Sequence, residues 1–429
     1  MKPDLAELVG AELTRLSDGG ALGVAISGGG DSTALLLIAV DWARRIGLEI
    51  RAATVDHGLR PESGAEAAGV AALCARMGVS HETLLWTDWD GGGNLQAAAR
   101  DARRRLLADW AKGAGLGGVL LGHTMDDQAE TVLMRLGRGS GVDGLSGMRP
   151  LTEAGGVRWL RPMLSARRSD IRTWLIARGE KWVDDPSNED DRFARIRTRR
   201  ALEGLDDIGV NAPRLAATAD RLNDARQALD HAAGALAADA ANWGRCGELY
   251  LSLPKLRAAP VELRRRLLRA GLISASGAEY GPRADAEQKL MSAILSLKLG
   301  GGRSLHGCLI RPMGADRVVI TREASAVGAD RGGLWDGRFE IAQTAPTDGA
   351  TLGPVGETGA SRLSALAANG DWTAPPDWLA APLSARLTTP ALWRGEALIA
   401  APVAAYGDAL TARFAAHRSW WASGGPATV

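Results

Sequence analysis

Residues 21–37 read ALGVAISGGGDSTALLL, and this stretch decides how the first part of the chain folds. Residues 22–26 are an apolar run of strand length, and a long apolar segment suited to a helix begins just after Asp31 and Ser32. Between them lies SGGGDS, whose glycines allow backbone N–H groups to converge at the positive end of the new helix. The stretch therefore predicts a strand, a phosphate-binding loop and a helix. The alternative is a glycine-rich surface turn.

Position 31 distinguishes this loop from the Walker type. A Walker loop carries a lysine before its Ser or Thr, and that lysine reaches the terminal phosphates. Here the position is Asp31. A carboxylate repels a phosphate unless a divalent cation lies between them. Asp31 therefore predicts Mg²⁺ as well as a nucleotide.

Length and composition limit the possible classes of protein. A chain of 429 residues predicts two or three domains. Because 51 Lys and Arg nearly balance 50 Asp and Glu, any nucleic-acid surface must be local. Cys74, Cys246 and Cys308 are far apart in the sequence, which argues against a disulfide framework, a zinc site or a redox pair. The N-terminus is not signal-like and no apolar run is long enough to cross a membrane, so we expect a cytoplasmic protein with no membrane partner.

Strands and helices alternate after the loop. Further strands are expected at residues 50–55, 80–85 and 118–122, with helices at 62–77, 94–112 and 126–138. This order predicts an α/β fold with a doubly wound parallel sheet. Ligands of such sheets bind beyond the carboxyl ends of the strands. The loop at Ser27, the segment at Asp56 and the segment at His123 are therefore expected on one rim.

The pattern changes in the second half. Leu222, Leu229, Leu236 and Trp243 recur every seven residues, which predicts one amphipathic helix of about thirty residues. Such a helix can separate two domains or lie in the core of an all-α domain. Residues 301–312 (GGRSLHGCLIRP) are interpreted as a turn, and the Gly- and Pro-rich end as a small domain or extension. The expected domains are 1–205, a mainly helical 206–327, and 328–429.

A group of acidic residues forms the second strong signal. Residues 121–131 read LGHTMDDQAET, and on a helix Glu130 shares a face with both Asp126 and Asp127. Carboxylates at the rim of a phosphate site hold Mg²⁺ or receive a cationic substrate. The alternative is that Asp126 is only an N-cap and that the helix dipole favours Asp127.

These motifs resemble a known family. SGGGDS resembles the SGGxDS loop of the N-type ATP pyrophosphatases (the PP-loop enzymes). LGHTMDDQAET, VDHGLR at 55–60 and the Arg100 and Arg103 pair resemble the tRNA(Ile)-lysidine synthase family specifically. LGRGSG at 136–141, GLSGM at 144–148, RP at 161–162 and DPSN at 185–188 continue the likeness, which is fainter in the second half. Arg104 and Thr124 depart from it, since an aromatic residue and a second histidine are frequent there.

The resemblance implies an adenine nucleotide alpha hydrolase-like fold and a carbon-nitrogen ligase. In that family ATP adenylates the wobble cytidine of tRNA(Ile) with a CAU anticodon, and free L-lysine then displaces AMP to give lysidine. Ser27, Gly28, Gly29, Gly30, Asp31 and Ser32 would hold ATP, with Asp31 on Mg²⁺. Asp127 and Glu130 would bind lysine and one would accept its proton, while His123 and Arg103 would lie by the transferring adenylate. A homodimer is left open.

Simpler interpretations of the last two residues remain. His123 can be a hydrogen-bonded core histidine. Arg100 and Arg103 can form a solvated helix face.

Two arginine clusters are candidates for binding tRNA phosphates, and the middle domain is expected to bind tRNA. The first comprises Arg192, Arg195, Arg197, Arg199 and Arg200; the second comprises Arg257, Arg264, Arg265, Arg266 and Arg269. Either cluster can instead be a solvated face paired with acids, such as residues 189–191 for the first. In the second, Glu262 is the only acid nearby in sequence.

Two other functions are compatible with parts of this pattern. A tRNA thiolase would use the same loop but needs catalytic or cluster-binding cysteines, and Cys74 alone lies in the first domain. A non-catalytic nucleotide- or RNA-binding module would need the arginines and not the carboxylates.

Overall fold

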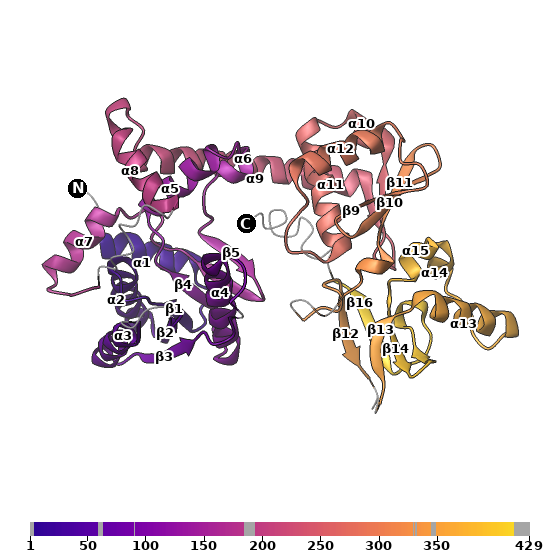
Figure 1. Ribbon diagram of the computed structural model, residues 1–429, viewed down its shortest axis with the longest axis horizontal. Helices are drawn as coiled ribbons and strands as arrows, with labels where there is room; N and C mark the ends of the chain where they lie inside the picture. The colour runs from indigo at the N-terminus through magenta and orange to yellow at the C-terminus, as the bar shows by residue number, and fades with distance from the viewer. Residues whose placement is uncertain are drawn as a thin grey trace. The chain divides into compact units, whose positions relative to one another are not determined.

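The computed structural model describes residues 4–58, 63–89, 91–183, 194–328, 330, 333–344 and 349–415. The chain divides into two compact units, Met1–Arg226 and Gln227–Val429. The division falls inside α9 (Ala212–Ala240), a helix of 29 residues that confirms the long helix expected from the heptad spacing (Figure 1). The three-domain division with boundaries at 205 and 327 stays a prediction.

The first unit is built on a six-stranded sheet with the order β3-β2-β1-β4-β6-β5. Its strands are β1 (Leu22–Ala25), β2 (Ile50–Asp56), β3 (Ser80–Leu85), β4 (Gly118–Leu121), β5 (Leu151–Ala154) and β6 (Val157–Leu160). All neighbours run parallel except the edge strand β5, which is antiparallel to β6. The predicted parallel sheet is confirmed, and the β5–β6 hairpin, which turns at two glycines of positive φ, Gly155 and Gly156, is an addition.

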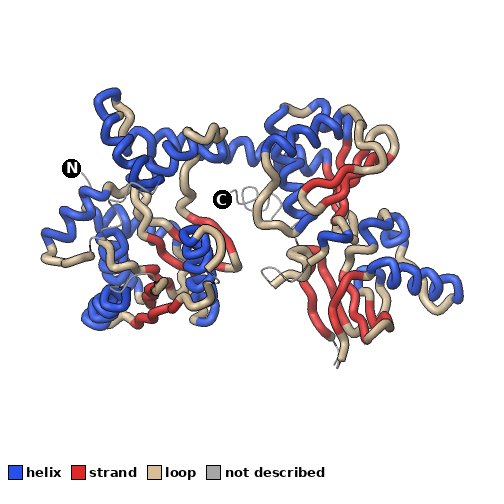
Figure 2. Tube along the Cα trace, viewed as in Figure 1, coloured by secondary structure: helices blue, strands red, loops and turns tan. Residues whose placement is uncertain are grey.

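Helices cover both faces of this sheet, as a doubly wound fold requires (Figure 2). The helices that contact the strands most closely are α2 (Gly30–Ile46), α3 (Ser63–Met77) and α4 (Leu95–Gly113). The unit also contains α1 (Leu5–Leu16), α5 (Met125–Leu136), α6 (Val142–Leu145), α7 (Arg168–Ala177) and α8 (Ala194–Gly204). Successive strand residues point to opposite faces. Val24 accordingly packs in the cluster of α1, α2, α3 and α7, whereas Ala25 packs against α4.

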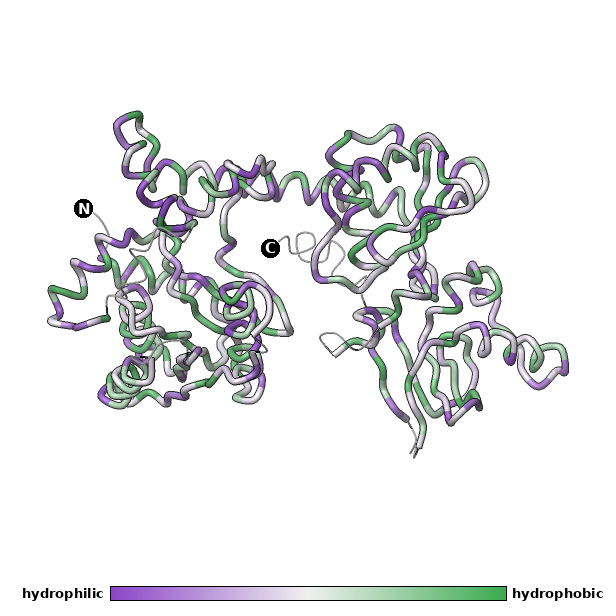
Figure 3. Tube along the Cα trace, viewed as in Figure 1, coloured by the Kyte–Doolittle hydropathy of each residue, from purple (hydrophilic) through white to green (hydrophobic). Residues whose placement is uncertain are grey.

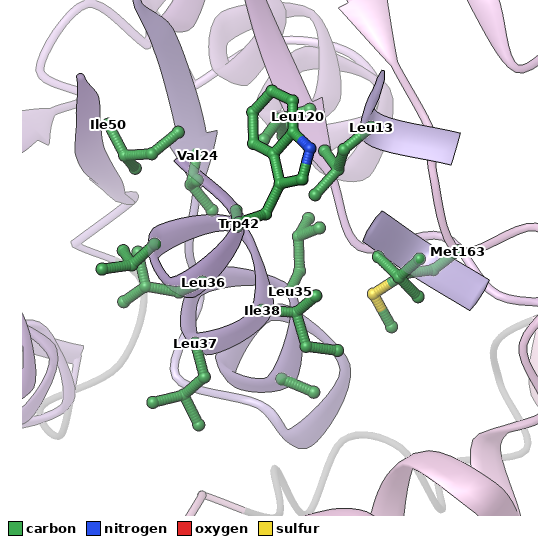
Figure 4. Close-up of a cluster of buried hydrophobic side chains, with 14 of the residues drawn as sticks. Leu13, Val24, Leu35, Leu36, Leu37, Ile38, Trp42, Ile50, Leu120 and Met163 are labelled. Atoms are coloured by element: carbon green, nitrogen blue, oxygen red, sulfur yellow. The ribbon is translucent and has the colours of Figure 1, made fainter. Parts of the chain in front are cut away.

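The central helix α2 fixes the position of the phosphate loop. Residues 34–40 of α2 are all buried. Leu35, Ile38 and Trp42 pack with Leu13, Val24 and Leu120 in the largest cluster of this unit (Figure 4). Each fully buried side chain of this size contributes about 1.5–3 kcal/mol. The helix therefore begins at a fixed place above the sheet.

The second unit contains a five-stranded antiparallel sheet with the order β7-β8-β11-β10-β9. The strands are β7 (Ala241–Trp243), β8 (Leu249–Ser252), β9 (Arg303–Leu305), β10 (Cys308–Met313) and β11 (Arg317–Arg322); the helices are α10 (Leu253–Ala258), α11 (Val261–Ser276) and α12 (Ala284–Leu295). The region is thus helical with a small antiparallel sheet, which agrees with the predicted mainly helical fold. The segment interpreted as a turn is a hairpin, because His306 and Gly307 both have positive φ and connect β9 to β10.

The end of the chain has its own hydrophobic cluster, which includes Trp335, Phe339 and Trp378. Its elements are β12 (Phe339–Gln343), β13 (Thr351–Pro354), α13 (Gly356–Asn369), α14 (Pro376–Ala380), α15 (Leu383–Arg386), β14 (Pro390–Arg394), β15 (Ala397–Ala400) and β16 (Leu410–Phe414). None of the helices in the described ranges is long and apolar enough to cross a membrane.

Candidate active site

The glycine loop connects β1 directly to the first turn of α2. Gly29 is the N-cap and the helix begins at Gly30, so Asp31 lies inside the first turn and not before the helix as expected. Gly28 has a φ of +83°, which a side chain would strain, and a Cβ there would lie 3.3 Å from Val70 Cγ2. The loop therefore needs glycine at position 28. Asp31 lies at the positive end of the helix.

Ser32 closes the loop from within. Its hydroxyl accepts a hydrogen bond from the backbone N–H of Ser27 at 3.2 Å and donates one to the carbonyl of Gly29 at 3.0 Å. The end of β4 lies against the same turn, because a Cβ on Gly122 would be 3.2 Å from both the Cα and the nitrogen of Ser32. This close approach brings the segment that follows β4, beginning with His123, next to the loop.

A capping box starts α5 and positions Asp127. Thr124 is the N-cap: its hydroxyl oxygen accepts from the backbone N–H of Asp127 at 3.3 Å, and Asp127 Oδ2 accepts from the backbone N–H of Thr124 at 2.8 Å. The alternative in which Asp126 caps this helix is therefore wrong. Asp126 Oδ2 instead accepts from the backbone N–H of Arg168 at 2.8 Å.

Arg168, which sequence reasoning missed, joins the acidic residues into one cluster. Its Nε lies 3.2 Å from Asp31 Oδ2 and its Nη2 lies 3.2 Å from Asp127 Oδ1. Its Nη1 lies 3.6 Å from Glu130 Oε1. A signal was present, since Arg168 opens α7 and a cation is unfavourable at the positive end of a helix. Such a local conflict points to an acidic partner elsewhere in the fold.

Glu130 is the most deeply buried member of the cluster, with 1% of its side chain exposed. Arg199 Nε, from α8, donates to its Oε1 at 2.9 Å. Its Oε2 is buried and has no hydrogen-bond partner within the described ranges. Three carboxylates, those of Asp31, Asp127 and Glu130, thus contact the guanidiniums of Arg168 and Arg199.

The environment shifts the pKa values of the acids in different directions. Burial raises the pKa of Asp31; Arg168 opposes this effect, and the nearby carboxylate of Asp127 adds to it. Burial also acts to raise the pKa of Asp127, but Arg168, His123 and the backbone N–H of Thr124 outweigh it and the net shift is downward. Asp127 is therefore ionised, and Asp31 would be stabilised by a cation.

His123 is neutral in this site. Burial lowers its pKa to about 3, and Arg161, Arg195 and Arg103 act in the same direction against Asp127. Its Nδ1 is buried without a hydrogen-bond partner among the described residues, so it is not a satisfied core histidine. Of the two residues expected beside the transferring adenylate, His123 is thus neutral and Arg103 carries the positive charge.

Arg103 lies on α4 near two histidines. It is close enough to lower the pKa values of both His57 and His123. The pKa of Arg103 is itself lowered, mainly by the surrounding protein and then by Arg100. The side chain remains accessible to solvent.

The first arginine cluster contributes to the site as well as to the surface. Arg199 pairs with Glu130, and Arg195 is near enough to Asp127 and His123 to affect their pKa values. Arg197 is exposed on α8, which Figure 3 shows as a hydrophilic segment. Arg192 and the DPSN motif lie outside the described residues.

The second cluster is largely paired inside its own unit. Arg265 pairs with Glu262 at 2.7 Å and lies 3.8 Å from Glu287, and Arg266 pairs with Asp230 at 2.6 Å. Glu262 is the only acid nearby in sequence but not in space, because Asp230 and Glu287, which are distant in sequence, also lie beside these arginines. Arg264 Nε is buried without a partner in the described part of the chain. Contact of Arg264 and Arg265 with tRNA stays a prediction.

The residues present fit Mg²⁺ only in combination with a nucleotide. No group of three or more metal-ligating side chains occurs in the ranges that the structure describes. Mg²⁺ is commonly held by one or two carboxylates together with substrate phosphates and water. Asp31, at the loop and beside other carboxylates, would be such a ligand.

The chain is similar to known proteins over most of its length. Residues 4–204 match the family model described as a PP-loop domain. The chain is similar to a tRNA(Ile)-lysidine synthase from Ruegeria pomeroyi, at 43% identity over 91% of this chain and 90% of that protein. It is also similar to one from Hyphomonas neptunium, at 41% identity over 67% and 78%. Among solved structures, a U34-tRNA thiolase from Methanococcus maripaludis aligns at 17% identity over 51% of this chain and 77% of that chain, with a TM-score of 0.45.

Proposed function

Because the chain belongs to the tRNA(Ile)-lysidine synthase family, we propose that it ligates free L-lysine to the wobble cytidine of tRNA(Ile) with a CAU anticodon. Membership of the family makes it an ATP-using enzyme of the ligase type that modifies tRNA. The products would be lysidine in the tRNA, AMP and pyrophosphate. Cytoplasmic location and a homodimer stay predictions.

The observation that carries the proposal is the position of the acidic cluster. Asp127 and Glu130 converge with Asp31 on one guanidinium, and Asp31 lies in the first turn after the phosphate loop. An amine substrate needs carboxylates to bind its ammonium form, and an adenylating enzyme needs that amine next to the activated atom. The cluster supplies the carboxylates directly beside the loop that would hold ATP.

The first step would transfer AMP to the tRNA. The C2 oxygen of the cytidine attacks the α-phosphorus of ATP, a new P–O bond forms, and the bond to pyrophosphate breaks. Residues 27–32 would direct backbone N–H groups to the phosphates. Arg103 would offset charge that develops on the transferring group, and neutral His123 would offer a hydrogen bond there. Mg²⁺ on Asp31, when bound, would neutralise phosphate charge.

The second step would form the carbon–nitrogen bond. The ammonium of lysine would bind to Asp127 and Glu130, and one of these carboxylates would accept a proton from it. The free amine then attacks C2 of the cytidine, and the C2–O bond breaks as AMP leaves. The buried, unpartnered Oε2 of Glu130 supports a role for this residue in receiving the amine.

An assay with purified protein tests the proposal. ATP, Mg²⁺, radiolabelled lysine and a CAU-anticodon isoleucine tRNA should give lysine bound to tRNA and one pyrophosphate for each lysine. The same tRNA with another wobble base is the control and should take up none. Pyrophosphate release without lysine incorporation would retain the PP-loop chemistry and refute the lysine assignment.

The cysteines speak against the thiolase alternative. All three are free and buried, and only Cys74 belongs to the unit that carries the loop. Burial raises the pKa of Cys74 to about 11 and that of Cys308 to about 12, so these thiols stay protonated at neutral pH. Sulfur transfer needs a thiolate or a cluster ligand. The described residues offer neither at the site.

A further inference from the structure

Arg168 contacts the same carboxylates, Asp127 and Glu130, to which the proposed function assigns the ammonium of lysine. Its guanidinium contacts Asp31 and Asp127 at 3.2 Å and reaches Glu130 at 3.6 Å. Only 18% of its side chain is exposed. Burial acts to lower its pKa, but the surrounding carboxylates outweigh this effect and the net shift is upward. The guanidinium is therefore a permanent cation amid acids that would otherwise repel one another.

A second cation cannot share all of these contacts. A lysine ammonium bound to Asp127 and Glu130 would lie next to the Arg168 guanidinium, and two cations a few ångströms apart repel strongly in a partly buried site. Glu130 keeps a different partner, since Arg199 Nε donates to its Oε1 at 2.9 Å. The carboxylates can thus exchange Arg168 for an ammonium while Glu130 remains held by Arg199.

We propose that Arg168 is a positioning residue for the amine substrate: it holds Asp31, Asp127 and Glu130 together in the empty enzyme and gives up its contacts with Asp127 and Glu130 when lysine binds. The backbone of Arg168 can stay in place during this exchange, because its N–H is anchored on Asp126 at 2.8 Å. Only the side chain must move. This inference rests on the proposed function.

A consequence of the exchange is a cost on lysine binding. A substrate that must displace an internal occupant binds more weakly than the same site would allow if it were vacant. Replacing Arg168 by methionine, which keeps an unbranched side chain without charge, should therefore tighten the binding of lysine by about three- to tenfold. If Arg168 were a permanent support, or bound the substrate itself, the same change would weaken lysine binding.

The test titrates L-lysine into the wild-type protein and the Arg168→Met protein by calorimetry, with Mg²⁺ and a non-hydrolysable ATP analogue present. Guanidinium chloride at low millimolar concentration then supplies the lost group from solution. It should compete with lysine in Arg168→Met and leave wild-type binding unchanged. Arg172→Met is the control, because Arg172 is an exposed arginine on the same helix α7.

Two results would overturn the inference. One is lysine binding that is several-fold weaker in Arg168→Met; the other is absence of guanidinium competition in that variant. Should Arg168→Met fail to fold, Arg168→Lys is the second variant, because it keeps the charge but loses the several N–H donors of the guanidinium. It should bind lysine more tightly than the wild type and more weakly than predicted for Arg168→Met. Affinity below that of the wild type would again refute the exchange. Failure of the wild-type protein to bind lysine would instead refute the proposed function.

Discussion

Arg168 Nε lies 3.2 Å from Asp31 Oδ2, although 137 positions separate the two residues in the chain. The contact joins the helix that begins at the phosphate loop to the start of α7. Because the same guanidinium also contacts Asp127, the nucleotide side and the amine side of the proposed site share one charge network. A change of charge on either side should therefore alter the electrostatic potential on the other.

Asp31→Asn should reduce pyrophosphate release by about 10²-fold or more, because the variant lacks the carboxylate proposed to hold Mg²⁺ beside the phosphates. Release of pyrophosphate from ATP in the presence of tRNA and lysine measures the effect. The affinity for tRNA should not change. Asp41→Asn, an exposed acid on the same helix α2, is the matched control and should retain full activity. Full activity of Asp31→Asn would remove this residue from the mechanism.

Asp127→Asn should raise the KM for lysine at least about tenfold with a smaller effect on the KM for ATP, because it removes the charge that would bind the ammonium. The amide oxygen can still accept from the backbone N–H of Thr124, which Asp127 accepts at 2.8 Å. Asp127→Ala loses this cap as well and should cost a further ~1 kcal/mol of unfolding free energy. Steady-state kinetics and urea unfolding separate the two effects. Equal increases in both KM values would mean that the ammonium binds elsewhere.

The sequence was sufficient to place the loop and the acids but not their counterion. SGGGDS lies between an apolar strand and an apolar helix, so its local pattern predicts its structure. Asp127 and Glu130 share a helix, and periodicity brings them together. Arg168 contacts these acids because α7, which is far from them in the sequence, packs on α2. No local sequence pattern predicts this packing.

The same limit explains the second arginine cluster. The sequence near Arg265 and Arg266 contains few acids. Their partners Glu287 and Asp230 come from α12 and α9. Long-range ion pairs of this kind are decided by packing. The β9–β10 hairpin was missed for another reason, since its strands are short and its turn uses the non-glycine residue His306 at positive φ.

Asp336 belongs to the second unit and not to the proposed site. Asp336→Asn should lower the free energy of unfolding of the second unit by about 3–5 kcal/mol. The Asp336 carboxylate is completely buried and accepts from Arg322 at 2.8 Å and from Arg338 at 2.8 Å. Even beside this acid, burial lowers the pKa of Arg338 to about 10. Without the negative charge, two buried guanidiniums would face each other. Urea unfolding of the full chain measures the loss, and the exposed Asp371→Asn is the control; a loss below about 1 kcal/mol would contradict the prediction.

His123 should make the protein sensitive to mild acid. Burial lowers its pKa in the folded state to about 3 from the ordinary 6.5, so between these values the unfolded chain binds a proton that the folded chain does not. Stability must then fall as the pH falls through this window, by up to ~1.4 kcal/mol per pH unit. Between pH 6.5 and 5 the wild type should lose about 1.6 kcal/mol more than His123→Gln, because the unfolded histidine is only half protonated at pH 6.5.

Urea unfolding at several pH values between 5 and 6.5 tests this difference. In this pH range the stability that depends on Asp127 does not change. The pKa of Asp127 lies below its ordinary value in the folded protein, so the stability that depends on that acid is lost only at a lower pH. Other histidines with lowered pKa values, such as His57 and His306, contribute equally to both proteins and cancel in the comparison. His231→Gln, at an exposed position of α9, should behave as the wild type does. If unfolding free energy has the same pH dependence in His123→Gln and in the wild type, His123 takes up its proton in the folded protein. His123 would then carry a positive charge in the site, in addition to Arg103.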